Sequence, residues 1–163
     1  MSWFQPDLYY SSIYAVDLDL LRERGVDAII IDLDNTILPR DTGLLDQRAR
    51  DWVANAKERF RLAIVSNNTK AYPYEIAAEL ELPIITAALK PTTRGFRAAM
   101  RMLEVTPRET AVIGDQLFTD VIGGNRAGAT SVLVDPLVEH DLPHTLLLRR
   151  LTAPIIRHEK PLR

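Results

Sequence analysis

The chain has 163 residues, of which 47% are hydrophobic and 26% are charged, a balance that suits one soluble domain with a sizeable core. Its formal net charge of −2 offers no basic field for nucleic acid, and its lack of cysteine excludes disulfides, thiolate nucleophiles and cysteine-based zinc sites. No apolar run approaches the roughly 20 residues that span a bilayer, and no signal peptide precedes the domain, so we expect a cytoplasmic protein of the reducing cytosol.

In chain order, the sequence first predicts an irregular aromatic arm over residues 1–16 and a short helix at 17–24 that Gly25 closes. Apolar strands and amphipathic helices then alternate. The expected strands are 28–32, 61–66, 83–86, 110–113 and 130–134. The expected helices are 46–60, 73–82, 92–103 and 119–127. Short, almost continuously apolar strands are typical of a sheet covered on both faces, so we predict a doubly wound α/β fold with five mostly parallel strands.

This reading makes residues 1–163 a single domain with an arm and short helix at 1–25, a catalytic core at 28–135 and a tail at 136–163. The pair Gly123-Gly124 interrupts the helix expected at 119–127. Each glycine there costs roughly 1 kcal/mol relative to alanine, and a close approach of helix to sheet would explain both.

Polar residues stand where four of the expected strands end. They are Asp32 with Asp34, Ser66 with Asn67, Lys90, and Asp115 with Asp120. In doubly wound sheets the carboxyl ends of the strands line the ligand crevice, which explains why an apolar strand leads into two carboxylates.

This set of acids, a hydroxyl and a lysine suits phosphoryl transfer. A carboxylate can attack phosphorus and form an aspartyl-phosphate, which divides hydrolysis into two easier steps. Mg²⁺ held by oxygen ligands can cancel the repulsion between nucleophile and phosphate, while a lysine and a hydroxyl hold the remaining oxygens. A second acid protonates the leaving oxygen and later activates water.

The segments DLDNT (32–36), the strand end at Ser66, Lys90-Pro91 and GDQLFTD (114–120) resemble the four motifs of the haloacid dehalogenase (HAD) superfamily in order and spacing. The resemblance covers about residues 28–135. The arm PDLYYSSIYAVDLDLL and the stretch GGNRAGAT look like the YqeG group of subclass IIIA phosphatases, which is related to phosphatases of phosphatidylglycerophosphate. The resemblance implies a HAD-like Rossmannoid fold and a Mg²⁺-dependent phosphoric monoester hydrolase.

The resemblance also implies roles for the acids. Asp32 would be the nucleophile, and Asp34 would be the general acid and base. Asp115 would be the main metal ligand, joined by Asp32 and by the backbone carbonyl of Asp34. An acid at position 34 favours phosphatases over haloacid dehalogenases and P-type pumps, which carry other residues there.

The remaining motif residues would hold the phosphate or support the site. By the same resemblance, Ser66 would bind the phosphate with Asn67 nearby, and Lys90 would neutralise both nucleophile and phosphate. Thr36 would seat the motif loop. Asp120 would orient Lys90 or a metal-bound water, although an acid in the first turn of a helix is a structural alternative.

Two short gaps between motifs bear on the substrate. Only 31 residues separate Asp34 from Ser66, and only 23 separate Ser66 from Lys90, so we expect no cap domain. An open site suits a bulky phosphomonoester: a lipid head group, a macromolecule, or a small substrate enclosed by a partner subunit. Phosphatidylglycerophosphate is the specific prediction.

The C-terminal tail bears on the lipid interpretation. Residues 144–163 contain five Lys or Arg residues and one acid, interleaved with apolar residues. Such a segment can rest on an anionic membrane surface, but it is short and Pro154 breaks its helix, so we expect a solvated or docking segment, with peripheral membrane contact as the alternative.

Two other functions remain open. A phospho-accepting signalling module, such as a receiver domain, also clusters acids and a lysine at the ends of strands, although the DxDxT order disagrees with it. A binding scaffold could keep the motifs without turnover. Nothing in the sequence indicates an oligomeric state.

Overall fold

The structure is a computed structural model that describes residues 3–138. It contains a six-stranded sheet, in the order β1-β6-β5-β2-β3-β4, with every neighbouring pair parallel. The strands are β1 (Leu8–Tyr10), β2 (Ala28–Ile31), β3 (Arg61–Val65), β4 (Ile84–Ile85), β5 (Thr110–Gly114) and β6 (Thr130–Val134). The predicted doubly wound α/β fold is confirmed, with six strands in place of five.

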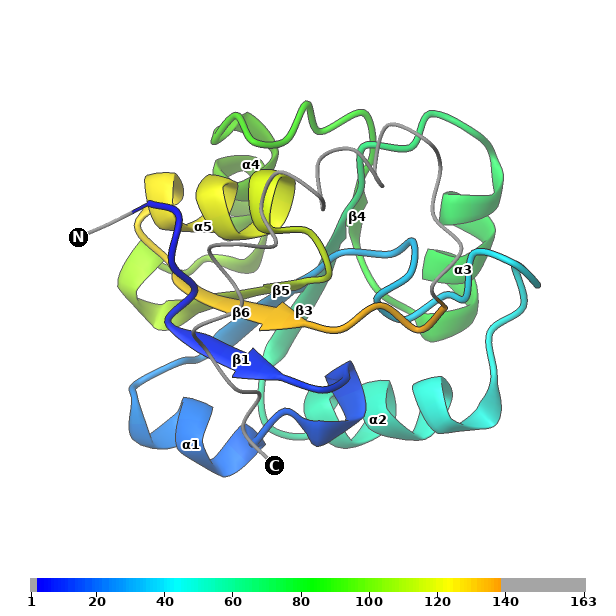
Figure 1. Ribbon diagram of the computed structural model, residues 1–163, viewed down its shortest axis with the longest axis horizontal. Helices are drawn as coiled ribbons and strands as arrows, with labels where there is room; N and C mark the ends of the chain where they lie inside the picture. The colour runs from blue at the N-terminus through cyan, green and yellow to red at the C-terminus, as the bar shows by residue number, and fades with distance from the viewer. Residues whose placement is uncertain (1–2, 139–163) are drawn as a thin grey trace.

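Helices cover both faces of this sheet (Figure 1). They are α1 (Leu18–Glu23), α2 (Gln47–Lys57), α3 (Tyr72–Leu80), α4 (Arg94–Leu103) and α5 (Ile122–Ala127). Two 3₁₀-helices, η1 (Ile13–Ala15) and η2 (Pro107–Glu109), and one π-helix, η3 (Leu117–Val121), complete the described chain. The α2 helix ends at Lys57, three residues before the predicted end at 60.

The central strand β2 shows why the sheet needs two helical layers. Ile29 and Ile31 belong to a core cluster with residues of α1, α2 and α3, whereas Ala28 and Ile30 belong to a second cluster with residues of α4 and α5. All four side chains are fully buried. Alternate side chains of a strand point to opposite faces, so a strand that is apolar at every position must be covered on both.

The aromatic arm contains a strand, β1, and a 3₁₀-helix, η1, which corrects the prediction of an irregular segment. Leu8–Tyr10 pairs with β6 as the outermost strand, and Tyr10 is buried in the core. Asp7 fixes the pairing, because its backbone N–H donates to the Ser131 hydroxyl (3.1 Å) and its carboxylate accepts from the Ser131 N–H (2.8 Å). Packing of the arm on the sheet, which the sequence did predict, is therefore confirmed.

The two adjacent glycines of α5 permit the close approach that their position predicts. A Cβ added at Gly124 would lie 3.0 Å from the Cβ of Val112 in β5, and one added at Gly123 would lie 2.4 Å from the ring of Phe96 in α4. Both distances are shorter than ordinary van der Waals contact. The α5 helix can therefore pack against β5 and α4 only with small residues here.

Within residues 3–138 there is no cap domain. A loop, α2 and β3 fill the chain from Asp34 to Ser66, and α3 and β4 fill most of the chain from Ser66 to Lys90. None of the helices in this range combines the length and apolarity needed to cross a bilayer. The segment 144–163, for which membrane contact is the alternative, lies outside the described residues.

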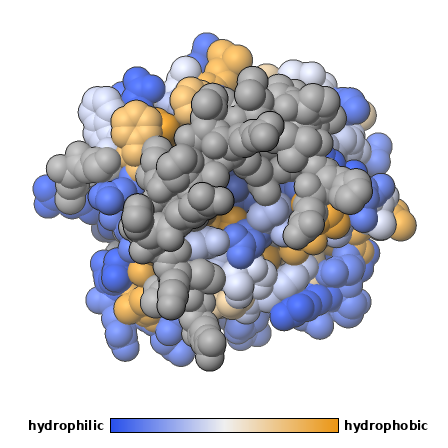
Figure 2. All heavy atoms as spheres, viewed as in Figure 1, coloured by the Kyte–Doolittle hydropathy of each residue, from blue (hydrophilic) through white to orange (hydrophobic). Residues whose placement is uncertain are grey.

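Large exposed apolar side chains come from several separate parts of the described chain. They are Trp3, Phe4, Leu44, Tyr74, Leu89, Met102 and Phe118. Figure 2 shows one face of the molecule, on which hydrophobic spots of the described surface are separated by hydrophilic residues.

Candidate active site

The topology creates a crevice between β2 and β5. The connection that leaves β2 passes through α2 over one face of the sheet, and the connection that leaves β5 passes through η3 and α5 over the other. Loops that diverge in this way open a crevice at the carboxyl ends of the strands, where ligands bind in open α/β sheets. Asp32 directly follows β2, and Asp115 directly follows β5.

Asp32, Lys90 and Asp120 form a buried ion-pair network in this crevice. The Lys90 ammonium donates to Asp32 Oδ1 at 2.5 Å and to Asp120 Oδ1 at 2.6 Å. All three residues are at most 7% exposed. Charge-assisted hydrogen bonds of this length in a buried site are strong and hold the three groups in fixed relative positions.

The network shifts the protonation of both partners. Burial raises the pKa of Asp32 to about 7, with Lys90 opposing the shift and Asp120 adding to it. Burial would lower the pKa of Lys90, but the charges and hydrogen bonds of Asp120 and Asp32 outweigh it, so this pKa lies above its ordinary value. Lys90 therefore stays protonated at neutral pH, while the buried Asp32 carboxylate takes up a proton at a higher pH than an exposed aspartate does.

The same crevice offers a set of oxygen atoms for a divalent cation. Asp32, Asp115 and Asp120 each present a carboxylate oxygen, and these atoms lie within 4.8 Å of one another. Thr36 supports this set, because its hydroxyl lies 3.4 Å from Asp115 Oδ1. Among residues 3–138, these three buried carboxylates lie near one buried ammonium, that of Lys90. Hard carboxylate oxygens at this spacing fit Mg²⁺, which would add positive charge to the site.

Asn67 and Ser66 support the site through the backbone. The Asn67 side chain accepts from the Lys90 N–H (2.7 Å) and donates to the Lys90 carbonyl (3.2 Å), so it holds the segment that carries the lysine. The Ser66 hydroxyl is buried and accepts from the Asn68 N–H at 3.0 Å. Ser66 directly follows β3, next to the carboxyl end of β2, and the loop that bears Asp34 lies nearby.

Two residues that the sequence did not single out for a role hold Asp34. The Tyr72 hydroxyl donates to Asp34 Oδ1, and the Asn68 amide donates to Asp34 Oδ2 at 3.2 Å. Asn68 also donates to the Tyr72 oxygen at 2.5 Å, so each of the three side chains is hydrogen-bonded to the other two. Asn68 belongs to the polar end of a predicted strand, whereas nothing local in the sequence marks Tyr72.

A π-helix positions Asp120. Its second carboxylate oxygen accepts from the Gln116 N–H at 3.2 Å, one residue before η3 begins. The sequence predicts an ordinary helix from 119, but the chain enters α5 through this wider turn. Single π-helical turns are rare and occur frequently at functional sites.

Comparisons with known proteins agree with this geometry. The HAD-hydrolase-like family model matches residues 88–137. A Bacillus subtilis (strain 168) protein named probable phosphatase YqeG is 38% identical over 140 residues, which cover 85% of this chain and 81% of that protein. This chain belongs to the YqeG family of HAD-like phosphatases. It is therefore a hydrolase, as the four motifs predicted.

Two more distant proteins are also similar to this chain. This YqeG-family chain is 23% identical to the chloroplastic/mitochondrial phosphatidylglycerophosphate phosphatase 1 of Arabidopsis thaliana; the match covers 93% of the chain and 47% of that protein. The chain thus spans about half the length of that relative. Its fold matches the cobalt-bound deoxy-D-mannose-octulosonate 8-phosphate phosphatase of Haemophilus influenzae with a TM-score of 0.56 and 16% identity, over 82% of this chain and 89% of that one.

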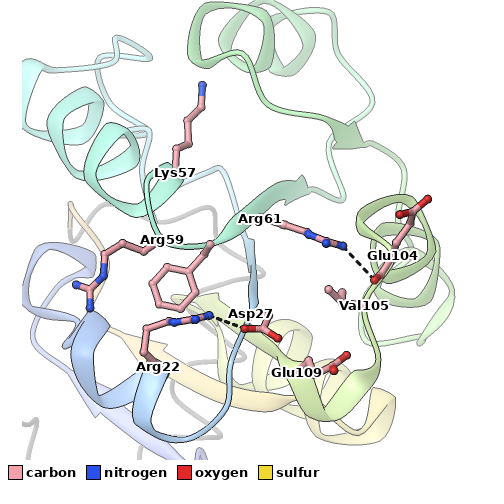
Figure 3. Close-up of a pocket in the computed structure, with 9 residues that line it drawn as sticks. Arg22, Asp27, Lys57, Arg59, Arg61, Glu104, Val105 and Glu109 are labelled. Carbon is pink, nitrogen blue, oxygen red and sulfur yellow. Dashed lines mark hydrogen bonds and ion pairs between the residues drawn. The ribbon is translucent and has the colours of Figure 1, made fainter.

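A separate cavity of about 540 Å³ lies at the other end of the sheet of this YqeG-family chain (Figure 3). It opens beside Asp27, Arg61 and Glu109, which stand at the amino ends of β2, β3 and β5. Its arginines already have partners, because Arg22 pairs with Asp27 (2.5 Å) and Arg61 donates to the Leu103 carbonyl (2.6 Å). The cavity is thus remote from the carboxyl-end crevice that collects the motif residues.

Proposed function

We propose that this phosphatase is a Mg²⁺-dependent phosphomonoester hydrolase that forms an aspartyl-phosphate on Asp32. One observation carries the proposal. The Asp32 carboxylate follows the central strand, lies 2.5 Å from a buried ammonium, and has oxygens of Asp115 and Asp120 within 4.8 Å of its own. A nucleophile, a fixed cation and an acidic set for a second cation therefore share one crevice.

In the first step, an Asp32 oxygen attacks phosphorus and the bond from phosphorus to the leaving oxygen breaks. Asp34, in its protonated form, gives its proton to that leaving oxygen. In the second step, the Asp34 carboxylate takes a proton from water, and the water oxygen attacks phosphorus. The bond from phosphorus to Asp32 breaks, which releases inorganic phosphate and restores both acids.

The cations of the site balance negative charge during both steps. Lys90 would hold a phosphate oxygen beside Asp32, and Ser66 would donate to another. Asp32, Asp115 and the backbone carbonyl of Asp34 would hold Mg²⁺, with Asp120 orienting Lys90. When bound, Mg²⁺ supplies positive charge that offsets the repulsion between carboxylate and phosphate.

The proposed substrate is a bulky phosphomonoester, with phosphatidylglycerophosphate as the specific candidate. Two observations support it: residues 3–138 contain no cap domain over the crevice, and a relative that is 23% identical is named for this lipid. We also propose that residues 1–163 form one phosphatase domain, and that the basic segment 144–163 brings it to anionic lipid.

Phosphate release from 4-nitrophenyl phosphate tests the mechanism. We expect release to require Mg²⁺, to stop when the metal is chelated, and to vanish in Asp32→Asn. The matched control is Asp51→Asn, which changes an exposed acid of α2 and should behave as the unchanged protein does. Normal turnover by Asp32→Asn would overturn the nucleophile assignment. A stable phosphoprotein without turnover would instead support a signalling module.

A further inference from the structure

A pocket of about 410 Å³ opens beside Asp34, on the side of the site away from β5. Its lining residues are Asp34, Leu38, Pro39, Arg40, Gly43, Asn68, Lys70 and Tyr72. They come from the loop after β2 and from the segment that joins β3 to α3. Asp34 is held at this wall by the hydrogen bonds from Tyr72 and Asn68.

The position of Asp34 determines what this pocket can hold. A general acid must lie within hydrogen-bond reach of the oxygen that it protonates. If Asp34 protonates the leaving oxygen, the leaving group extends from phosphorus past Asp34, and the pocket that Asp34 lines is where it goes. The motif residues Lys90 and Asp115 do not line this pocket and are buried, and under the proposed mechanism they would contact the reacting phosphate or its metal instead.

The charge of the wall indicates the chemistry of that leaving group. Two of the eight lining residues, Arg40 and Lys70, are cationic, and Asp34 is the one acid. The Lys70 side chain is exposed and has no carboxylate partner within residues 3–138. Leu38 and Pro39 add apolar surface.

We propose that this pocket is a leaving-group subsite that selects phosphomonoesters whose alcohol carries a second anionic group, a phosphodiester being the best fit. The proposal rests on the proposed function, since it takes Asp34 as the general acid. A phosphodiester a few bonds from the reacting phosphate occurs both in a phospholipid head group and in its soluble, deacylated form. The subsite recognises the anion that both share.

A matched pair of soluble substrates tests the subsite. Glycerol 3-phosphate and glycerophosphoglycerophosphate both release a primary alcohol, but only the second carries a phosphodiester on it. We expect the unchanged protein to prefer the second by about tenfold or more in kcat/KM, and we expect Lys70→Gln to reduce that preference by about three- to fivefold. Exposed ion pairs have effects of roughly this size, and added salt should weaken the preference. Lys70→Glu should reduce it further.

Lys57→Gln is the matched control, because Lys57 lies on α2 by the cavity at the opposite end of the sheet and pairs with Glu81. It should keep the full preference. A third measurement uses phosphatidylglycerophosphate, the diacyl form of the second substrate, in phosphatidylcholine vesicles. Lys70→Gln should again reduce kcat/KM there.

Equal hydrolysis of the two soluble substrates by the unchanged protein would overturn the subsite. So would an equal loss on both substrates in Lys70→Gln, since the lysine would then only attract any anion. The subsite would also be overturned if Lys70→Gln lowered kcat/KM only for the lipid in vesicles and not for the soluble phosphodiester, because the lysine would then recognise the membrane surface. In each case Mg²⁺-dependent release of phosphate would leave the proposed function standing. Release from none of the substrates would overturn both proposals.

Discussion

The hydroxyl of Tyr72 offers a direct test of how Asp34 is positioned. Burial, with the hydrogen bond and charge of Asp34, raises the pKa of Tyr72, so the hydroxyl keeps its proton and donates to Asp34. We expect Tyr72→Phe to lower kcat for an alkyl phosphate about tenfold with little change in KM. General acid–base catalysis contributes roughly 10²–10⁴-fold, and a carboxylate free to rotate loses part of it. Steady-state kinetics measures both constants.

Tyr74→Phe is the control, because it makes the same chemical change, the loss of a tyrosine hydroxyl, on the same helix, α3. Tyr74 is 54% exposed, and its hydroxyl lies 2.5 Å from the Thr86 hydroxyl, away from Asp34. This variant should keep the kcat of the unchanged protein. Equal losses in both variants, or a rise in KM alone for Tyr72→Phe, would contradict a positioning role.

At the level of residues, the sequence could predict which side chains meet but not everything that holds them. Asp32, Lys90 and Asp115 stand at the ends of apolar runs, and the carboxyl ends of parallel strands share one edge. Tyr72 reaches Asp34 from 38 residues away, and a hydrogen bond between side chains of separate elements leaves no periodic pattern. The catalytic roles of these residues stay predictions.

At the level of elements, the junction of β5 with the π-helix depends on Gly114. A Cβ added there would lie 2.3 Å from Asp120 Cγ and 2.5 Å from Asp120 Cβ. Rotation of the Asp120 side chain cannot relieve a clash with its own Cβ, so Gly114→Ala must displace the π-helix. We expect a loss of about 1–3 kcal/mol in the free energy of unfolding, as for other overpacked sites, together with at least a tenfold loss of kcat. Urea unfolding and steady-state kinetics test the two effects.

Gly25→Ala separates this effect from a general cost of replacing glycine. Gly25 has a φ of +80° after α1, and nothing lies within 4 Å of an added Cβ. Strain in the left-handed region costs about 1–2 kcal/mol, so stability should fall while kcat stays unchanged. If Gly114→Ala, like Gly25→Ala, lowers stability but leaves kcat unchanged, then catalysis does not depend on the present position of Asp120.

Five strands of the sheet were predictable because each is a run of apolar residues next to a helical pattern: β2, β3, β4, β5 and β6. The strand β1 was not, since it has three residues and its partner β6 lies more than 120 residues along the chain. The π-helix was also missed. It differs from an α-helix by one residue in a single turn, which is too little to change the spacing of apolar side chains.

At the scale of the whole molecule, the crevice is a source of instability that a cation would relieve. Within residues 3–138, three buried carboxylates, those of Asp32, Asp115 and Asp120, lie close together beside one buried ammonium, that of Lys90. Carboxylates buried this close together repel one another, and burial already raises the pKa of Asp32 to about 7. The two parallel strands that carry Asp32 and Asp115 lie at the centre of the sheet, so this cost falls on the most buried part of the fold.

The effect of Asp115→Asn on stability should therefore depend on whether metal is present. In excess chelator, loss of one negative charge should leave the melting temperature equal to or higher than that of the unchanged protein. In Mg²⁺ at about 100 times its Kd, the unchanged protein should gain roughly 2.7 kcal/mol from binding, and Asp115→Asn should gain much less. Thermal melts with and without Mg²⁺ measure both, and the amide keeps an oxygen that can accept from Thr36. A variant less stable than the unchanged protein in chelator would show that Asp115 holds the fold rather than the cation.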